Sequence, residues 1–303
     1  ADYLAASLSP QGFGPLNNNG DLDANRERVS DLARRFSRAD WSYIASAGAS
    51  GTPPLHRARY FPWAGHAFFR TSYGSDAQFA FFDIGPWGAA HQHNDKLNLV
   101  VAAHGRELLS DGGRYRYTPD DPVVAYLRSS AGHNVILLDD AGQGPETPVA
   151  TASQPAAFQS HAQFDFAVGQ FDAGFVGLAD RNRHIRAVVH KRDDYWLVID
   201  RVETQAQRRI TAHWRFGDSL TVLADAGDAV STDPGLGNLR ITPISASPLR
   251  LELIRGRDGP TPMGWYSPAY HDRRPATVAR FDVEGRGVTY LAWVLTPARN
   301  TPA

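Results

Sequence analysis

The sequence contains no cysteine and only one methionine, Met263. The absence of cysteine excludes a disulfide framework and any zinc site built on thiolates. No run reaches the roughly 18 apolar residues that a membrane-spanning helix needs. The balance of 31 Lys+Arg against 32 Asp+Glu leaves no basic excess for nucleic acid or an anionic membrane. Because residue 1 is alanine, we expect a processed product or a piece of a longer protein.

The first 55 residues have the spacing of short amphipathic helices. Apolar residues recur at helical intervals at Val29, Leu32, Ala33 and Phe36. A second helix is expected around Trp41 and Ile44, and the Gly- and Pro-rich stretch at 48–54 marks its end and a boundary. Two such helices cannot bury their apolar faces alone. We therefore expect residues 1–55 to pack on the rest of the chain or on a helical partner.

Residues 56–303 lack a helical period. They contain short segments rich in β-branched and aromatic residues, separated by Gly, Pro, Asn and Asp. The predicted strands are 66–73, 78–84, 97–104, 134–138, 164–168, 184–190, 195–202, 210–216 and 288–294. Short strands without intervening long helices predict a mainly β fold, a large antiparallel β-sandwich or barrel.

One polar, glycine-flanked patch concentrates residues that can carry chemistry. His91 and His93 lie beside Asp95, and Asp111 and His133 follow in similar surroundings. If residues 91–93 are extended, both imidazoles project to the same side, because side chains alternate along a strand. Two histidines with a carboxylate and a third histidine make a plausible zinc set. The alternative is that these histidines only form hydrogen bonds within polar turns.

Three blocks in this region follow one another in a family pattern. They read HQHNDKLNL at 91–99, GRELLSDGGRY at 105–115, and Arg128 followed by HN at 133–134. This order, HxHxD, then GRxLLxDxGxY, then RxxxxHN, resembles the heparinase II/III-like polysaccharide lyases, a group that includes oligoalginate lyases. The resemblance is tight over roughly residues 56–140 and persists more weakly to about residue 216.

The resemblance implies an N-terminal α/α toroid followed by an antiparallel β-sandwich, with the active site in the cleft between them. On that basis, residues 1–55 would be the end of the toroid and residues 56–303 the sandwich. The remaining toroid would belong to a preceding part of the protein or to a separate N-terminal chain. The resemblance also implies a protein that acts in the periplasm or outside the cell.

The same resemblance implies one structural zinc ion held by His93, Asp111 and His133. Asp95 is then most simply a hydrogen-bonding partner of His91 or His93. A zinc ion that ties these strand ends together would fix the loop and present His91 to the substrate cleft.

The implied activity is β-elimination on a uronic-acid-containing polysaccharide of the alginate or glycosaminoglycan type. His91 is expected to act as base or as stabiliser of the uronate carboxylate, since histidine changes protonation near neutral pH. Tyr115 is the second expected catalytic residue, and the toroid would supply the others. The expected substrate contacts are Arg70, Arg114, Tyr117 and Arg128.

Two other hypotheses remain. The chain can be a non-catalytic carbohydrate-binding or structural β-sandwich with a zinc-stabilised loop. A zinc hydrolase is a weaker alternative, because the patch has no glutamate base of the kind that an HExxH helix supplies.

Overall fold

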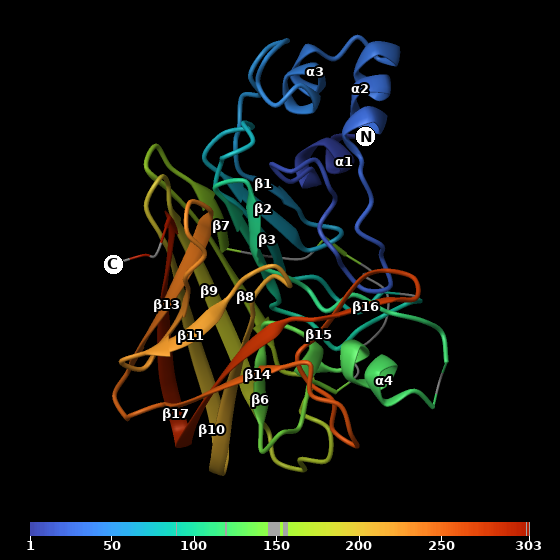
Figure 1. Cartoon of the computed structure of the whole chain (residues 1–303). Helices are drawn as coiled ribbons and strands as arrows, with labels where there is room; N and C mark the ends of the chain where they lie inside the picture. The colour runs from blue at the N-terminus through green and yellow to red at the C-terminus, as the bar shows by residue number, and fades with distance from the viewer. Residues whose placement is uncertain (89, 119, 145–151, 154–156, 301, 303) are drawn as a thin grey trace.

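The computed structural model describes residues 1–303 except 89, 119, 145–151, 154–156, 301 and 303. Its described part is mostly β, as predicted, and every pairing between the named strands is antiparallel. A five-stranded sheet packs against a ten-stranded sheet, and three short helices lie at the N-terminal end (Figure 1). Among the described residues, no helix is both long and apolar enough to cross a membrane.

The N-terminal helices are α1 (Asp2–Ser7), α2 (Arg26–Arg35) and α3 (Ala39–Ala45). The last two confirm the helices expected from the spacing, and α1 was not predicted. Val29, Trp41 and Ile44 form a small core together with Tyr73, which belongs to the sheet region. The helices therefore bury part of their apolar surface on the rest of this chain, one of the two outcomes expected for them.

The five-stranded sheet has the order β1-β2-β3-β4-β5. Its strands are β1 (Arg59–Phe61), β2 (His66–Arg70), β3 (Phe79–Asp83), β4 (Leu99–Ala103) and β5 (Arg106–Leu109). Every residue of β3 and β4 is buried, because this sheet is covered on both faces. One face contacts Ala6 of α1, and the other joins the main core between the sheets.

The larger sheet is organised around two long neighbouring strands, β10 (Trp196–Arg215) and β17 (Thr277–Arg299). Its order is β11-β12-β13-β17-β10-β9-β8-β7, with β14 on β17 and β6 on β10. The other strands are β6 (Ile136–Leu138), β7 (Ala157–Ser160), β8 (Phe164–Phe171), β9 (Arg183–Lys191), β11 (Val222–Asp225), β12 (Asp228–Ser231), β13 (Gly237–Ser245) and β14 (Arg250–Arg255).

The two strands predicted at 195–202 and 210–216 are one continuous strand. The polar stretch between them stays in β10. Pairing with β17 continues to Thr204, is interrupted by a register shift, and resumes at Arg208. Three fully buried tryptophans of these long strands, Trp196, Trp214 and Trp293, fill the main core.

A charged network is buried in the same core. The Asp200 carboxylate accepts hydrogen bonds from Arg186 Nε at 2.7 Å, His184 Nε2 at 2.6 Å and Trp293 Nε1 at 2.8 Å. Burial opposes ionisation of Asp200, but Arg186 and His184 outweigh it and hold its pKa below the usual range. Arg186 Nη1 also donates to the carbonyl of Leu97 at 2.9 Å, which ties the network to the loop that precedes β4.

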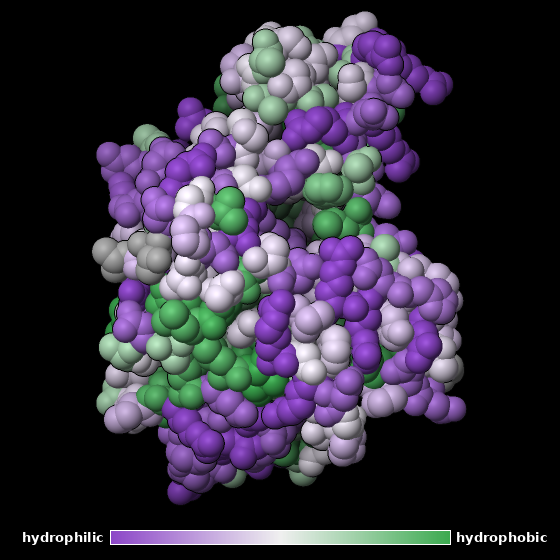
Figure 2. Space-filling view, in the orientation of Figure 1, coloured by the Kyte–Doolittle hydropathy of each residue, from purple (hydrophilic) through white to green (hydrophobic). Residues whose placement is uncertain are grey.

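The remaining elements lie together at one side of the sheets. They are α4 (Pro122–Arg128), the 3₁₀ turn Ser130–Gly132, and the hairpin of β15 (Trp265–Ala269) and β16 (Asp272–Pro275) (Figure 1). On the face shown in Figure 2, the larger apolar area lies at the left. Polar residues dominate around α4 and this hairpin.

Candidate functional site

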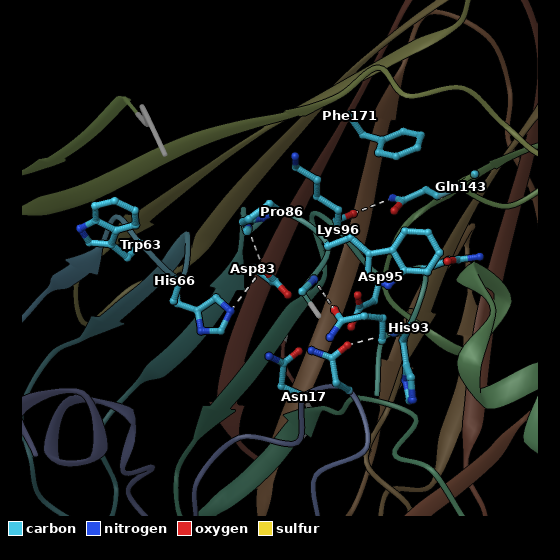
Figure 3. A pocket seen from close by; sticks show the side chains of 18 residues that line it. Asn17, Trp63, His66, Asp83, Pro86, His93, Asp95, Lys96, Gln143 and Phe171 are labelled. Atoms are coloured by element: carbon cyan, nitrogen blue, oxygen red, sulfur yellow. Dashed lines mark hydrogen bonds and ion pairs between the residues drawn. The ribbon is translucent and has the colours of Figure 1, made fainter. Parts of the chain in front are cut away.

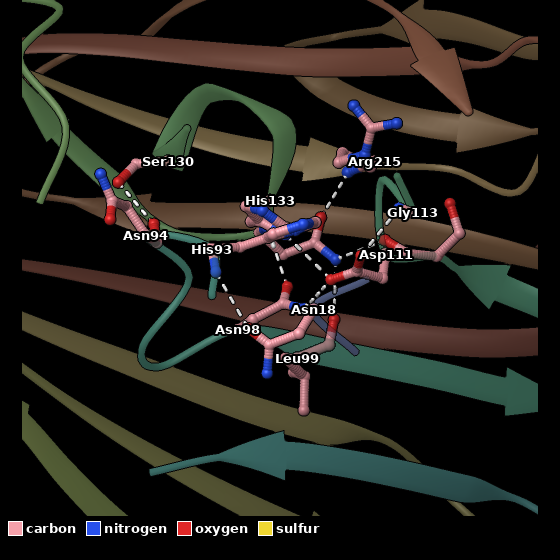
Figure 4. A network of polar contacts seen from close by, with 12 residues as sticks. Asn18, His93, Asn94, Asn98, Leu99, Asp111, Gly113, Ser130, His133 and Arg215 are labelled. Atoms are coloured by element: carbon pink, nitrogen blue, oxygen red, sulfur yellow. Dashed lines mark hydrogen bonds and ion pairs between the residues drawn. The ribbon is translucent and has the colours of Figure 1, made fainter. Parts of the chain in front are cut away.

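Four segments that are far apart in the sequence meet near the ends of β3 and β5. The loop that follows β3 carries His91, His93 and Asp95. Asp111 follows β5, and His133 follows the 3₁₀ turn and precedes β6. The fourth segment is the N-terminal loop at 17–21, which lies against these residues (Figure 4).

His93, Asp95 and His133 form a buried group of possible metal ligands. One ligand atom from each lies within 4.8 Å of the others. His93 Nδ1, Asp95 Oδ2 and His133 Nε2 are buried and have no hydrogen-bond partner in the described part of the chain. A buried polar atom without a partner costs about 1–3 kcal/mol, so three of them in neighbouring side chains need an explanation. A metal ion bound among them would provide it.

The hydrogen bonds around the group set both histidine tautomers for metal binding. Asn19 Oδ1 lies 2.9 Å from His93 Nε2, and this oxygen only accepts, so the proton sits on Nε2 and Nδ1 keeps its lone pair. Asp111 Oδ2 lies 2.9 Å from His133 Nδ1, which likewise leaves the lone pair on Nε2. Partners of this kind orient the imidazoles of metal-binding histidines. The residues present therefore fit a zinc ion.

The electrostatics point the same way. Burial, followed by the neighbouring His133, lowers the pKa of His93 to about 3, so this ring is neutral and able to act as a ligand. Burial, together with the nearby Asp83 and Asp111, raises the pKa of Asp95 well above its usual value. A carboxylate in such a position ionises favourably only beside a cation.

Both carboxylates considered from the sequence lie at this group. Asp95 has a ligand atom within 4.8 Å of those of the two histidines, and ligation by Asp111, the carboxylate expected from the sequence, stays a prediction. Asp111 accepts from His133 Nδ1, from Asn98 Nδ2 at 2.6 Å and from the backbone N–H of Gly113 at 2.9 Å. Burial opposes ionisation of Asp111, but His133 outweighs it and the pKa lies below the usual value. Asp111 thus orients His133.

His91 is an exposed residue on a left-handed turn, with φ of 61°. His91 is not extended, so the alternation of side chains expected for an extended segment 91–93 does not apply. His93 is buried and His91 is at the surface. Asn19 lies between them and contacts both rings, because its Nδ2 lies 2.9 Å from His91 Nδ1. An amide NH₂ only donates, so neutral His91 carries its proton on Nε2.

Tyr117 and Arg114 lie next to His91. The Tyr117 hydroxyl is 3.4 Å from His91 Nδ1, and the two ring centroids are 5.9 Å apart. The Arg114 guanidinium lies 5.0 Å from the Tyr117 ring centroid and donates to both carboxylate oxygens of Asp21, at 2.7 and 2.8 Å. Both bonds to Asp21 come from Nη2 of Arg114, and the expected substrate contact of Arg114 stays a prediction.

Tyr115 faces a different neighbourhood. Its half-buried ring lies between the guanidinium groups of Arg116 and Arg273, with centroid distances of 4.8 and 5.8 Å. It lines a cavity of about 420 Å³ beside α4. Tyr117, and not Tyr115, is therefore the tyrosine of this pair that contacts His91.

Arg70 and Arg128 differ in their fit to a substrate contact. Arg70 is fully buried, donates to the backbone carbonyls of Ala6 and Leu8, and stacks against Tyr73, so its predicted substrate contact is wrong. Its role is to hold α1 on the small sheet. Arg128 is exposed at the end of α4, and its backbone carbonyl accepts from the N–H of Asn94, next to the metal-ligand group.

A cavity of about 330 Å³ adjoins the metal-ligand group (Figure 3). His93 and Asp95 line one side, and Trp63, His66 and Asp83 line another. His66 Nε2 lies 3.5 Å from Asp83 Oδ1, and its Nδ1 lies 2.7 Å from the hydroxyl of Tyr3 in α1. This second polar chain ties α1 to the small sheet.

The residues that sequence reasoning missed are Asn19, Asp21 and Tyr270. No local pattern shows that residues 17–21 will contact residues 72 or 93 positions away. Tyr270 lies at the turn of the unpredicted β15–β16 hairpin, with its ring 5.9 Å from that of Tyr117.

Two curated relatives of this chain are named heparin-sulfate lyases. A heparin-sulfate lyase from Bacteroides stercoris is 23% identical over 270 residues, which are 86% of this chain and 37% of that protein. A heparin-sulfate lyase from Pedobacter heparinus is 24% identical over 220 residues, 71% of this chain and 32% of that protein. The chain thus spans about a third of the length of these two curated relatives.

Solved structures share the fold over nearly the whole chain. A mutant of the heparan sulfate lyase HepC from Pedobacter heparinus superposes with a TM-score of 0.84 at 18% identity, covering 100% of this chain and 46% of that one. A structure of heparinase III gives 0.81 at 13% identity, covering 99% and 48%. The family described as heparinase II/III-like, C-terminal, matches residues 53–299, which include the whole metal-ligand group, and the chain therefore belongs to this family.

Proposed function

We propose that this chain is the C-terminal part of a lyase that cleaves a uronic-acid-containing polysaccharide, of the glycosaminoglycan type, by β-elimination. The observation that carries the proposal is His91, which is exposed, held by Asn19 and in contact with Tyr117. The names of the two heparin-sulfate lyases support glycosaminoglycan as the substrate class. Alginate, the other polyuronate expected from the sequence, is the first alternative substrate to test.

β-Elimination on a uronate has three requirements. A base removes the proton at C5, a donor or cation stabilises the charge that develops on the C6 carboxylate, and an acid protonates the leaving O4. The C5 proton is weakly acidic, so stabilising the developing enolate should be the largest contribution.

The tautomer of His91 favours one of its two expected roles. Because Nδ1 accepts from Asn19, neutral His91 presents an N–H donor at Nε2. An N–H donor at Nε2 can bind the uronate carboxylate, whereas a general base would need a lone pair at Nε2. We assign His91 to carboxylate stabilisation and place the Tyr117 hydroxyl, 3.4 Å away, next to the reacting centre.

The remaining catalytic groups are proposed to come from a helical toroid. The curated relatives are about three times as long as the matched region, which supports a larger catalytic unit. In this proposal residues 1–55 are the end of the toroid and residues 56–303 are the sandwich. The rest of the toroid precedes them in the same protein or is a separate chain, and the enzyme acts in the periplasm or outside the cell.

We also propose that the metal is a single structural zinc ion. His93 Nδ1, His133 Nε2 and the Asp95 carboxylate would hold it, since these are the usual zinc ligand types. When bound, it supplies a fixed positive charge that ties the loop of His93 to the start of β6. The chain's own residues, Asn19 and Asp111, orient the two imidazoles for it.

The test is ultraviolet absorbance of the unsaturated uronate formed on heparan sulfate, heparin and alginate. It uses the longer protein that the proposal implies, with His91→Ala as the variant. The exposed Tyr290 lies on β17 outside the site, so Tyr290→Ala is the matched surface control. We expect His91→Ala to abolish product formation and the control to retain it. Absence of product on every polyuronate would refute the lyase proposal.

A second candidate is a carbohydrate-binding sandwich without catalysis. The exposed rings of Tyr117 and Tyr270 beside His91 favour it. It predicts that polyuronate binds to the longer protein and that no unsaturated product forms, a result that the same assay distinguishes from elimination.

A further inference from the structure

Two exposed tyrosines from distant parts of the chain form a pair beside His91. Tyr117 is 51% exposed and Tyr270 is 47% exposed. Their ring centroids are 5.9 Å apart and the planes are inclined by 40°. Tyr117 follows the Asp111 segment, and Tyr270 lies at the turn between β15 and β16. Neither ring is in a hydrophobic core cluster, so core packing does not account for the pair.

Arg114 holds the two rings in place from one side. Its guanidinium lies 5.0 Å from each ring centroid, and Asp21 receives two hydrogen bonds from it. A guanidinium over an aromatic ring is attracted by the π-electrons. One ion-paired arginine therefore orders both tyrosines and leaves their other surfaces accessible.

The backbone around Tyr270 is also well anchored. The N–H of His271 donates to the carbonyl of Tyr115 at 2.7 Å, and the N–H of Leu22 donates to the carbonyl of Pro268 at 2.7 Å. These bonds tie the hairpin to both the Tyr115 segment and the N-terminal loop. A surface ordered before binding loses little conformational entropy when a ligand settles on it.

The position of the pair relates it to the proposed chemistry. The Tyr117 hydroxyl is 3.4 Å from His91 Nδ1, so a ligand ring on the pair would lie next to His91. The guanidinium groups of Arg116 and Arg273, which are ion-paired with Asp121 and Asp258, lie against the ring of Tyr115. Flat aromatic faces with polar tips beside a histidine match an acidic carbohydrate. Its pyranose rings have a C–H face and its carboxylate or sulfate groups are anionic.

We propose that Tyr270, together with Tyr117, forms a stacking subsite for one pyranose ring of an acidic oligosaccharide, adjacent to the ring that His91 contacts. The sugar class rests on the proposed function, but the binding itself requires no catalysis. The hairpin β15–β16 is then a substrate-positioning element, and Tyr270 is the residue through which it acts.

The experiment is calorimetric titration of this chain with a heparan sulfate hexasaccharide. Loss of one aromatic contact is worth about 0.5–1.5 kcal/mol, so Tyr270→Ala should weaken binding about threefold to tenfold. Tyr270→Phe keeps the ring and should bind like the wild type. Tyr290→Ala removes a tyrosine of similar exposure, 58%, from β17 and should also bind like the wild type. Because both side chains are at the surface, unchanged thermal unfolding will show that the variants fold.

The outcomes separate this inference from the lyase proposal. Weakened binding in Tyr270→Ala supports the subsite whether or not elimination occurs, and only the absence of product from the longer protein refutes the lyase. Elimination product with unchanged affinity in Tyr270→Ala refutes the subsite and leaves the lyase standing. No binding by the wild type, equal losses in Tyr270→Ala and Tyr290→Ala, or a loss in Tyr270→Phe equal to that in Tyr270→Ala would each overturn the stacking subsite.

Discussion

Removing the zinc ion proposed for the group of His93, Asp95 and His133 should destabilise the whole chain. Without metal, three buried atoms in these neighbouring side chains have no partner in the described part of the chain. Each such atom costs about 1–3 kcal/mol, so the zinc-loaded chain should be more stable by about 3–9 kcal/mol. For a domain of this size, 1 kcal/mol corresponds to about 2 °C in Tm. The expected decrease in Tm on chelation is therefore at least about 6 °C.

Differential scanning calorimetry can measure this directly. The chain is dialysed against a chelator, then titrated with zinc, and elemental analysis is used to count bound metal, with one ion per chain expected. A ligand that binds only the folded state stabilises it more as the free ligand concentration rises above Kd. The Tm should therefore increase with zinc concentration. His104→Ala changes a partly exposed histidine outside the group and should respond like the wild type.

Two variants test the assignment of the carboxylates. Asp95→Asn should abolish the response to zinc while changing the metal-free Tm little, because burial already favours the neutral form of Asp95 there. Asp111→Asn should retain the response at high zinc but weaken the affinity about 10- to 100-fold, as expected for a residue that only orients a ligand. An unchanged response in Asp95→Asn, or equal Tm values with and without zinc, would refute the reasoning.

Three further predictions concern the core and the hydrogen bonds at His91. Arg186→Met should lower the free energy of unfolding in urea by about 3–5 kcal/mol, because it leaves Asp200 charged and buried without its partner. The double variant Arg186→Met/Asp200→Leu should recover part of this stability. No recovery would contradict the pairing. Burial lowers the pKa of His213 to about 4 from 6.5, so the stability that it contributes is present above pH 6.5 and is lost as the pH falls towards 4. This loss is about 3 kcal/mol. The free energy of unfolding of His213→Leu should therefore decrease less than that of the wild type over the same pH range. An identical pH dependence in the two proteins would contradict this role of His213. Asn19→Asp should move the proton of neutral His91 to Nδ1, since a carboxylate only accepts; nitrogen-15 NMR of the imidazole will detect the change, and an Nε2–H tautomer in the variant would contradict the assigned hydrogen bond.

The class of fold and the helices at 26–45 were predictable from local patterns. Alternating burial along β8 and β9 is a property of neighbouring residues, and it is visible in the sequence. The division of β10 into two strands was wrong for a physical reason. The polar residues between Thr204 and Arg208 interrupt the apolar pattern, but pairing with β17 on both sides of them keeps them within one strand.

The candidate site was predictable as a set of segments but not as a set of roles. The pattern at 91–134 brought together His91, His93 and His133, and all three lie in the described site. Which carboxylate faces the two histidine lone pairs depends on how the loop after β3 turns back. The left-handed conformation of His91 separates it from His93, and nothing in the local sequence requires that turn.

By itself, the sequence determined the antiparallel β architecture, the absence of cysteine chemistry and the histidine-rich blocks, because these follow from composition and short-range spacing. Only the tertiary structure decided that Asp95 joins the metal-ligand group, that Asn19 bridges two histidines, and that Tyr270 lies beside Tyr117. These contacts join residues from separate strands and loops. Their geometry is set by how the two sheets and the β15–β16 hairpin pack, which no local pattern contains.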